Sequence, residues 1–353
     1  MTRSTPTSFE VPRDLDHPVK RAPLVGVVYN PHSHHNKGRN SNPNTASNLG
    51  PSFDPDLGPD GADDPNILVA QPAGGDDLPQ ILADFAERGI DLLVINGGDG
   101  TVRDVLTSGL LVWGDNWPAL AVLPTGKTNA LNVELGAPKD WTLRQAVDAY
   151  SFGRRLQRRG VQVTATKGAL EGKSLLGFIL GAGAFTAGIK VGQDAHRLGV
   201  FNSLAVAGTS LWGVLQAVFG SDQNIWRRGA GLRLFVGQDA VELPHGGFGH
   251  PERRGLLFSS TLEKFPAGMK PFGPYRTGLK MVVMDKTRRR LLAMMPTMVL
   301  GFAPMWLQRI GLHFVQCEIY EMHIEDEFIL DGEAFPPGHY TVAKGPQLCF
   351  VVP

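Results

Sequence analysis

The chain has 353 residues, of which 42% are hydrophobic and 19% charged, and this length is sufficient for two globular domains. Lys plus Arg and Asp plus Glu are balanced at 34 each, so the net charge gives no reason to expect a nucleic-acid partner. The polar N-terminal segment lacks the apolar stretch of a secretory signal, and we expect a cytoplasmic protein. Cys317 and Cys349 form no metal-ligand pattern and are expected to be ordinary thiols.

The first part of the chain alternates between apolar runs and segments in which apolar residues have helical spacing. This alternation predicts a doubly wound parallel sheet in an α/β domain spanning residues 23–156. Residues 32–66 are rich in Asn, Ser, Pro, Gly and Asp, so we expect a flexible insertion there, and a flexible N-terminus over residues 1–22. Strands are expected at residues 23–30, 67–70, 92–96 and 119–124, and helices at residues 77–88, 101–111 and 141–150.

The strand at residues 92–96 runs into the sequence NGGDGT, which has three glycines in four positions. Glycine lets another group approach the backbone closely, and a turn from a strand into a helix presents N–H groups that bind phosphate. A bare carboxylate repels phosphate, so Asp99 is expected either to hold Mg²⁺ or to accept a proton from an attacking hydroxyl. Alone, the same letters would describe a tight turn with a solvated Asp.

A second polar loop, TGKTN, follows the strand at residues 119–124. Its hydroxyl and ammonium groups are suitable partners for phosphate, although Lys127 alone would be an ordinary surface lysine and Asn129 alone a helix cap. In parallel sheets, ligands bind at the carboxyl ends of the strands, where both loops lie. The two loops are therefore expected to form one polar site.

The second part of the chain has a different pattern. Short apolar strands separated by turn signals over residues 157–330 predict an antiparallel β-sandwich, interrupted by a helical insertion at residues 200–219. Residues 331–353 are expected to return to the cleft beside the first domain. Residues 291–307 are apolar and uncharged, but they are short for a membrane span and contain two prolines, so we expect core or interfacial packing.

Together, the segments NGGDGTVRDVLTSG and LAVLPTGKTNALNVELG resemble the diacylglycerol kinase catalytic-domain family, which includes sphingosine and ceramide kinases and bacterial lipid kinases. VVYNP is similar to the first strand and turn of that family, GAGAF (181–185) to its strand into the second domain, and DGEAFP (331–336) to its C-terminal motif. The resemblance implies an α/β nucleotide domain and a β-sandwich lipid domain, with ATP and Mg²⁺ in the cleft between them. It also implies transfer of the γ-phosphate of ATP to the hydroxyl of a lipid.

The resemblance assigns roles to individual residues. Glu333 is expected to accept the proton of the attacking hydroxyl, with Asp331 beside it. Asp99 is the alternative acceptor and the expected partner of Mg²⁺ bound to ATP. The residues expected to bind ATP are Asn30, Gly97, Gly98, Gly100, Thr101, Thr125, Gly126, Lys127 and Asn129.

The sequence also departs from the family pattern. Thr277 stands where bacterial members carry an Asp that binds a structural magnesium ion, so that metal is not expected here. The Asn129-Ala130-Leu131 sequence is similar to that of sphingosine kinases, which slightly favours a sphingoid substrate over a diacylglycerol-like one.

The partners are predicted from charge and apolarity. Arg288, Arg289 and Arg290 precede the apolar stretch 291–307, a combination that suits peripheral contact with an anionic membrane, although core helices beside a solvated Arg run would give the same pattern. The oligomeric state is left open, with a homodimer as one option. Two alternatives to a lipid kinase remain: a kinase of the NAD kinase type that acts on a soluble metabolite, and a lipid-sensing homologue that has lost catalysis.

Overall fold

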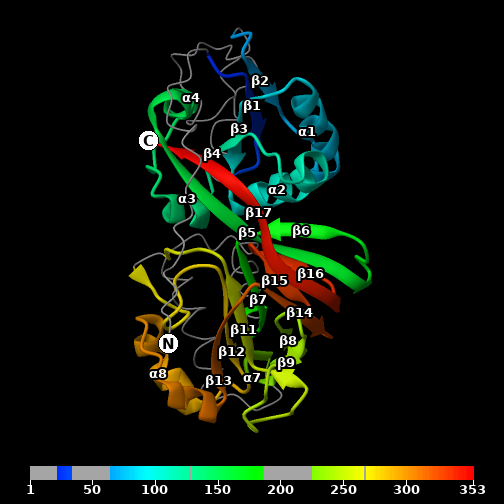
Figure 1. Cartoon of the computed structure of the whole chain (residues 1–353), viewed down its shortest axis with the longest axis vertical. Coiled ribbons are helices and arrows are strands. Elements are labelled where there is room, and N and C mark those ends of the chain that lie inside the picture. Colours follow the sequence, from blue (N-terminus) through cyan, green and yellow to red (C-terminus); the bar gives the residue numbers. More distant parts are fainter. Residues whose placement is uncertain (1–21, 34–63, 127–128, 187–224, 266–267) are drawn as a thin grey trace, which may run out of the picture.

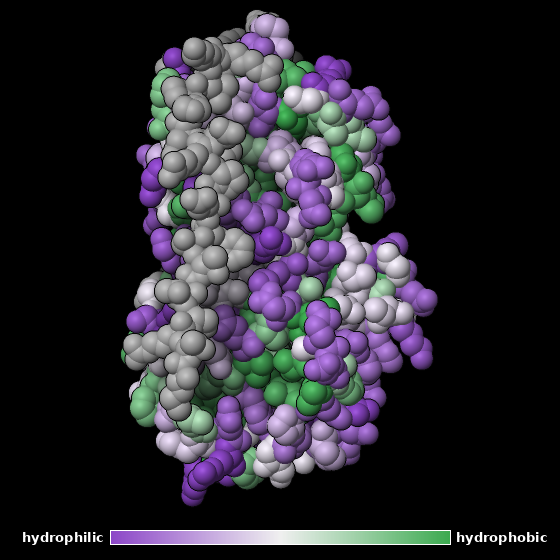
Figure 2. Space-filling model, viewed as in Figure 1, coloured by the Kyte–Doolittle hydropathy of each residue, from purple (hydrophilic) through white to green (hydrophobic). Residues whose placement is uncertain are grey.

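The computed structural model describes residues 22–33, 64–126, 129–186, 225–265 and 268–353. Almost all of the expected N-terminal segment 1–22, most of the expected insertion 32–66, the helix expected at residues 200–219, and Lys127 lie outside the described residues. The described residues form two lobes (Figure 1), and Figure 2 shows a notch between them on the right-hand side of the molecule.

The first lobe contains a parallel sheet with the strand order β2-β1-β3-β4. Residues of α1 and α2 pack on one face of this sheet, and residues of α4 pack on the other, so the strands are buried on both sides and have continuous apolar sequences. The elements are β1 (Val25–Tyr29), β2 (Ile67–Ala70), η3 (Gly75–Asp77), α1 (Leu78–Glu87), β3 (Leu92–Gly97), α2 (Asp99–Trp113), β4 (Ala119–Pro124), α3 (Ala130–Leu135) and α4 (Leu143–Phe152).

The second lobe is an antiparallel sandwich. Its six-stranded sheet has the order β13-β12-β11-β7-β15-β16, and its apolar side packs against β5, β8, β14 and β17 of the other sheet. The elements are β5 (Arg154–Gly168), β6 (Ser174–Gly177), β7 (Ile179–Gly183), α7 (Ile225–Arg228), β8 (Ala230–Val236), β9 (Val241–Glu242), β10 (Arg253–Arg254), β11 (Leu256–Ser260), β12 (Leu279–Met284), α8 (Arg289–Val299), η5 (Met305–Ile310), β13 (Leu312–Cys317), β14 (Ile319–Ile324), β15 (Phe328–Leu330), β16 (Glu333–Phe335) and β17 (Gly338–Val352).

Two long strands, β5 and β17, connect the lobes and pair with each other in antiparallel fashion. In the second lobe β17 also pairs with β14, and in the first lobe Phe350 of β17 pairs in parallel with Leu120 of β4. The eleven-stranded sheet to which both strands belong is therefore continuous across the two lobes. The expected combination of a doubly wound α/β domain with an antiparallel sandwich is confirmed.

A buried carboxylate joins α3 of the first lobe to the second lobe. Glu134, which is fully buried near the end of α3, accepts a hydrogen bond of 2.6 Å from Nε of Arg158 in β5. It also accepts the backbone N–H of Glu263, which follows β11, at 2.9 Å. Because α3 begins at the second polar loop, this contact fixes the position of that loop relative to the sandwich.

A helical layer covers the outer face of the six-stranded sheet. Leu291 and Met298 of α8 and Leu307 of η5 are buried against this face, whereas Leu300 and Met305 between them are exposed. The apolar stretch 291–307 is thus partly core and partly surface. No helix in the described part of the chain is long and apolar enough to cross a membrane.

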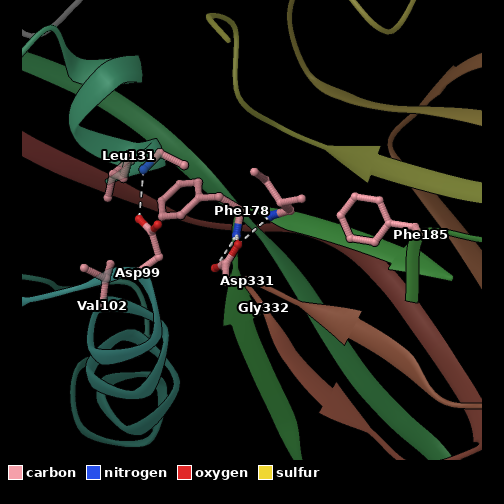
Figure 3. Close-up of a pocket in the computed structure, with 9 residues that line it drawn as sticks. Asp99, Val102, Leu131, Phe178, Phe185, Asp331 and Gly332 are labelled. Carbon is pink, nitrogen blue, oxygen red and sulfur yellow. Dashed lines mark hydrogen bonds between the residues drawn. The ribbon is translucent and has the colours of Figure 1, made fainter. Parts of the chain in front are cut away.

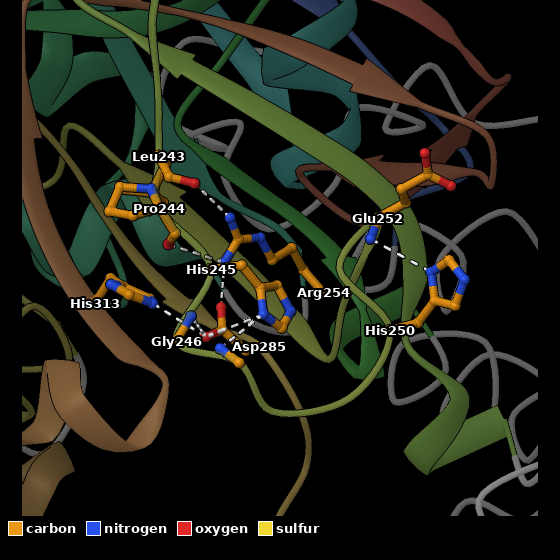
Figure 4. A network of polar contacts seen from close by, with 10 residues as sticks. Leu243, Pro244, His245, Gly246, His250, Glu252, Arg254, Asp285 and His313 are labelled. Atoms are coloured by element: carbon orange, nitrogen blue, oxygen red, sulfur yellow. Dashed lines mark hydrogen bonds and ion pairs between the residues drawn. The ribbon is translucent and has the colours of Figure 1, made fainter.

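A buried network of polar contacts fixes the loops at the end of the sandwich that lies away from the first lobe (Figure 4). Asp285 forms an ion pair with Arg254, and it accepts the backbone N–H of Gly246 at 2.6 Å. His313 Nε2 lies 3.2 Å from the same carboxylate. Burial raises the pKa of Asp285, but the His313 and Gly246 hydrogen bonds and the Arg254 charge lower this pKa overall, so the carboxylate is kept ionised.

Candidate active site

The first glycine loop lies where β3 ends and α2 begins. Gly98 is the N-cap of α2, and Asp99 is the first residue of the helix. A Cβ atom on Gly97 would lie 2.4 Å from Cβ of Thr101, so glycine is required there by packing. No atom lies within 4 Å of the corresponding position at Gly100. Packing within the described part of the protein therefore does not explain Gly100, and the space beside it is open.

The second polar loop packs directly against the first. A Cβ atom on Gly126 would lie 2.6 Å from Cα of Gly98, so the two loops touch through bare backbone. Asn129, in the left-handed region with a φ of 47°, closes its own loop, because its side chain accepts the N–H of Gly126 at 2.9 Å and donates to the carbonyl of Gly126 at 2.9 Å. Thr125 is buried at the end of β4. The expected meeting of the two loops is observed.

The turn after β1 is tied to the first loop. The side-chain amide of Asn30 donates a 2.7 Å hydrogen bond to the Thr101 hydroxyl, and its oxygen accepts the backbone N–H of His32 at 2.8 Å. Its backbone N–H donates to the carbonyl of Asn96. Asn30 thus ties the turn after β1 to the end of β3 and to the first glycine loop.

Asp99 connects the first loop to α3. Its Oδ1 accepts the backbone N–H of Ala130 at 2.9 Å. Burial raises the pKa of the Asp99 carboxyl, while backbone hydrogen bonds from Ala130, Leu131 and Asn129 lower it, and the net effect is upward. A positive charge beside Asp99 would favour the ionised form.

Asp331 reaches the same place from the C-terminal part of the chain. It adopts the left-handed conformation, with a φ of 46°, and its carboxylate accepts the backbone N–H groups of Phe178 and Ile179 at 2.9 and 2.8 Å. Burial raises the pKa of Asp331 to about 7 against these two hydrogen bonds, and the negative charge of Asp99 also raises it. Asp331 is therefore poised to gain or lose a proton near neutral pH.

A pocket of about 210 Å³ brings the two carboxylates together. Figure 3 shows Asp99 at the start of α2 and Asp331 beside Gly332, on opposite sides of this space. Its other walls are apolar and come from both lobes. They are formed by Val102, Ala130, Leu131, Phe178, Ile179 and Phe185.

Glu333 lies outside the lining of this pocket. Its side chain is 61% exposed, and Oε2 lies 3.9 Å from Nη1 of Arg103. Arg103 is buried on α2, one turn after Asp99, and its guanidinium also lies 3.4 Å from the carbonyl of Leu330 and 5.7 Å from the centre of the Phe335 ring. Arg103 thus contacts both strands, β15 and β16, that flank the turn carrying Asp331.

The sequence pattern did not reveal Arg103, Phe178 or Phe185. An isolated Arg on a helix usually has a solvated side chain, and the only signal was its position four residues after Asp99, on the same face of α2. Phe185 belongs to the GAGAF segment, but its sequence neighbours do not distinguish a ring that lines a pocket from a ring in a hydrophobic core. Phe178 precedes that segment in an apolar run and has no distinguishing neighbour.

The chemistry of these residues fits a magnesium–triphosphate group. The N–H groups at the start of α2 suit phosphate oxygens, whereas the N–H of Gly126 already donates to Asn129. Two carboxylates with raised pKa values suit a divalent cation that shares its remaining ligands with phosphate and water. In the described ranges, no group of three or more His, Cys, Asp or Glu side chains is placed to hold a metal without such help.

Residues 25–163 match the family model of the diacylglycerol kinase catalytic domain. This range covers the first lobe and the first part of β5, and it confirms the resemblance found in the sequence. The chain is 32% identical over 73 residues to Probable lipid kinase YegS of Shigella flexneri and to that of Escherichia coli O6:K15:H31. The match covers 20% of this chain and only 24% of these relatives.

The fold extends the likeness to both lobes. A diacylglycerol kinase structure from Bacillus anthracis str. Sterne aligns with a TM-score of 0.55 at 14% identity, over 93% of this chain and 96% of that chain. A second solved chain from the same organism aligns with a TM-score of 0.60 at 14% identity, over 93% of this chain and 97% of that one. At this identity the likeness concerns the fold alone.

Proposed function

We propose that the protein is a lipid kinase that transfers the γ-phosphate of ATP to the hydroxyl of a membrane lipid, because its first lobe matches a diacylglycerol kinase catalytic domain. The observation that carries the proposal is the pocket in which Asp99, which follows directly on the glycine-rich loop, and Asp331 face an apolar wall. A lipid hydroxyl attached to apolar chains suits such a wall. The substrate is diacylglycerol-like or sphingoid, meaning sphingosine or ceramide.

The glycine loops would bind the triphosphate. The backbone N–H groups at the start of α2 are fixed before ATP binds, because the second loop packs against Gly98 and is itself closed by Asn129. Fixed donors stabilise the charge that develops on the transferred phosphoryl group without reorganising. Mg²⁺, when bound with ATP, would screen the phosphate charge.

Two carboxylates are candidates for the proton acceptor. Glu333 is the acceptor expected from the family resemblance, and its side chain is exposed and lies 3.9 Å from Arg103. Asp331 lines the pocket, and a pKa of about 7 makes it an effective base at neutral pH. Asp99, next to the phosphate site, would then orient Mg²⁺ bound to ATP.

The pH dependence of the rate separates these candidates. If Asp331 accepts the proton, kcat rises with pH through about 7 in the wild type, and Asp331→Asn loses both this rise and most of the activity. If Glu333 accepts it, Glu333→Gln loses the activity, while Asp331→Asn keeps a measurable rate. Full activity in both variants would contradict the assignment of this pocket as the catalytic site.

The substrate class is tested by transfer of radiolabelled phosphate from ATP to diacylglycerol, monoacylglycerol, sphingosine, ceramide and NAD, each offered separately. Labelling of one lipid is the expected result. Labelling of NAD alone would favour the soluble-metabolite kinase, and labelling of none would favour a lipid-sensing protein without catalysis. The apolar wall formed by Leu131, Phe178 and Phe185 favours a lipid over NAD.

A further inference from the structure

We propose that one corner of the second lobe docks the protein on the surface of an anionic lipid bilayer. This docking surface consists of the exposed apolar residues Met269, Leu300, Phe302, Met305 and Trp306 together with the cations around them. The surface goes beyond the proposed catalytic function, because binding to vesicles can be measured without ATP and without any reaction.

The apolar part of the docking surface consists of five side chains that are each at least one third exposed. The exposed fractions are 85% for Met305, 69% for Leu300, 52% for Phe302, 45% for Trp306 and 36% for Met269. Large apolar side chains gathered in this way at the surface of a protein mark a site of interaction. In Figure 2, hydrophobic and hydrophilic atoms meet over α8, at the lower left of the molecule.

These residues form one surface, although they come from two segments. The backbone N–H of Lys270 donates to the carbonyl of Val299, so the segment after Gly268 lies against the end of α8. A Cβ atom on Gly301 would lie 3.3 Å from the Lys270 side chain and 3.3 Å from the guanidinium of Arg276. Met269 and its cationic neighbours are therefore beside the Leu300–Trp306 segment.

The charge of this region is strongly one-sided. In a chain with 34 basic and 34 acidic residues, residues 264–316 contain nine Lys and Arg and a single acidic residue, Asp285, which is buried in the network of Figure 4. Five of these cations are exposed: Lys270 and Arg276, which adjoin Gly301, Arg309 in the same η5 helix as Met305 and Trp306, and Arg289 and Arg290 at the start of α8. Each Lys or Arg near an anionic bilayer adds attraction, while apolar side chains enter the boundary between headgroups and acyl chains.

This combination of groups favours a bilayer over other partners. A second copy of the chain, placed face to face on a twofold axis, would bring the same cations against each other. A nucleic acid would neutralise the cations but leave Met305 and Leu300 in water. An anionic bilayer satisfies both the cations and the apolar side chains.

The docking surface connects to the candidate catalytic pocket through packed apolar side chains. Beneath it, Leu291, Met298 and Leu307 pack in one buried cluster with Phe272. The Phe272 ring stacks on Phe258 at 5.1 Å, and Phe258 stacks on Phe185 at 5.3 Å. Since Phe185 lines the pocket, a continuous apolar layer runs from the docking surface to the candidate active site.

The test is sedimentation of the full chain with vesicles of phosphatidylcholine alone or of phosphatidylcholine mixed with phosphatidylglycerol. We expect binding to the mixed vesicles and little to the neutral ones. Reversing the two exposed arginines in Arg289→Glu/Arg290→Glu should weaken partitioning by at least about 25-fold, at about fivefold per cation lost. Met305→Glu should weaken it by about tenfold or more, because a charge replaces a side chain that enters the bilayer.

The matched control is Phe152→Glu, because Phe152 is also 85% exposed but lies at the end of α4 in the first lobe. This variant should bind vesicles as the wild type does. Trp306 supplies a second readout: its emission should shift to the blue on mixed vesicles, and Trp306→Phe should lose that shift. Equal binding of neutral and mixed vesicles, or equal losses in Phe152→Glu and Met305→Glu, would overturn the proposal.

Two further outcomes are decisive. The wild type could fail to bind vesicles and instead form a dimer that Met305→Glu converts to a monomer. That result would overturn the proposal and show that this surface binds a second copy of the chain. Phosphate transfer to a dispersed short-chain lipid should be unchanged in Met305→Glu, because Met305 is not among the residues that line the pocket. Vesicle binding without any phosphate transfer would overturn the proposed function while leaving the docking surface intact.

Discussion

The substitution Gly126→Ala tests the contact between the two glycine loops. The added Cβ would lie 2.6 Å from Cα of Gly98 and 2.8 Å from Oδ1 of Asn129, whereas ordinary contacts begin at 3.4 Å. Backbone atoms on the Gly98 side cannot rotate away as a side chain can, so the loops must separate by about 1 Å. A misplacement of this size at a catalytic centre costs about 100-fold in rate, and overpacking costs about 1–3 kcal/mol of stability.

The assay has two parts. Steady-state kinetics with ATP as the varied substrate should show kcat/KM reduced about 100-fold, and urea unfolding should show a protein that still folds cooperatively with the stated loss of stability. The matched control is Gly75→Ala, because Gly75 lies in η3 with no atom within 4 Å of the added Cβ and without a positive φ. Gly75→Ala should leave both measurements near those of the wild type.

An unchanged kcat/KM for ATP in Gly126→Ala would show that close contact between the two loops is not needed for ATP use. It would mean either that the loops tolerate separation or that the triphosphate binds elsewhere. A variant that loses stability but keeps its ATP kinetics would lead to the same conclusion, because the contact would then be structural only.

Three other substitutions test the remaining parts of the site. Because the pKa of Asp331 is raised to about 7, the folded protein keeps a proton on this carboxylate between about pH 4 and pH 7, whereas the unfolded chain releases it. The free energy of unfolding of the wild type should therefore fall as pH rises through this window, by up to about 4 kcal/mol. Urea unfolding across this range should show a flatter dependence in Asp331→Asn, and an equal slope in both proteins would contradict the shift. Arg103→Ala should reduce kcat more than it raises KM for ATP, because Arg103 positions the turn around Leu330 and Glu333 without lining the pocket. Arg103→Lys should recover part of the lost kcat. An unaltered kcat in Arg103→Ala would show that Arg103 does not position this turn for catalysis. Asn30→Ala removes the 2.7 Å hydrogen bond to Thr101, which should cost about 1 kcal/mol of stability and weaken ATP binding severalfold, as measured by isothermal titration calorimetry; wild-type affinity would show that the bond is dispensable.

The meeting of the two glycine loops could be predicted from sequence because it follows from local patterns. Buried parallel strands are recognisable as apolar runs, and Gly97 of β3 is paired with Pro124 of β4, so the segments that follow the two strands emerge side by side. The short strand at residues 67–70 and the helix that contains Leu82 and Phe85 were likewise given by periodicity and are observed.

The position of the acidic turn could not be predicted in the same way. Asp331 enters the pocket because β15 pairs with β7 and because the N–H groups of Phe178 and Ile179 capture its carboxylate, and these contacts span about 150 residues of sequence. Glu333, two residues later, lies outside the pocket lining instead. The DGE letters identify the turn but do not say which carboxylate faces inward.

The apolar stretch at residues 291–307 shows a different limit of sequence analysis. Composition alone cannot separate core from surface here, since Leu307 is buried and Met305 is 85% exposed only two residues earlier. The short η5 turn decides which of them faces the sheet. Only the three-dimensional arrangement shows that the exposed members adjoin a cluster of cations.

The most direct test of the account is the rate of γ-phosphate transfer from ATP to the lipid panel by Asp99→Asn, with Asp115→Asn as the control, because Asp115 is an exposed aspartate beyond the end of α2. We expect a labelled lipid with the wild type and with Asp115→Asn, and a rate at least about 100-fold lower with Asp99→Asn. Equal rates for Asp99→Asn and the wild type would contradict the assignment of the catalytic site, because the pocket between the two lobes would then not be where phosphate is transferred.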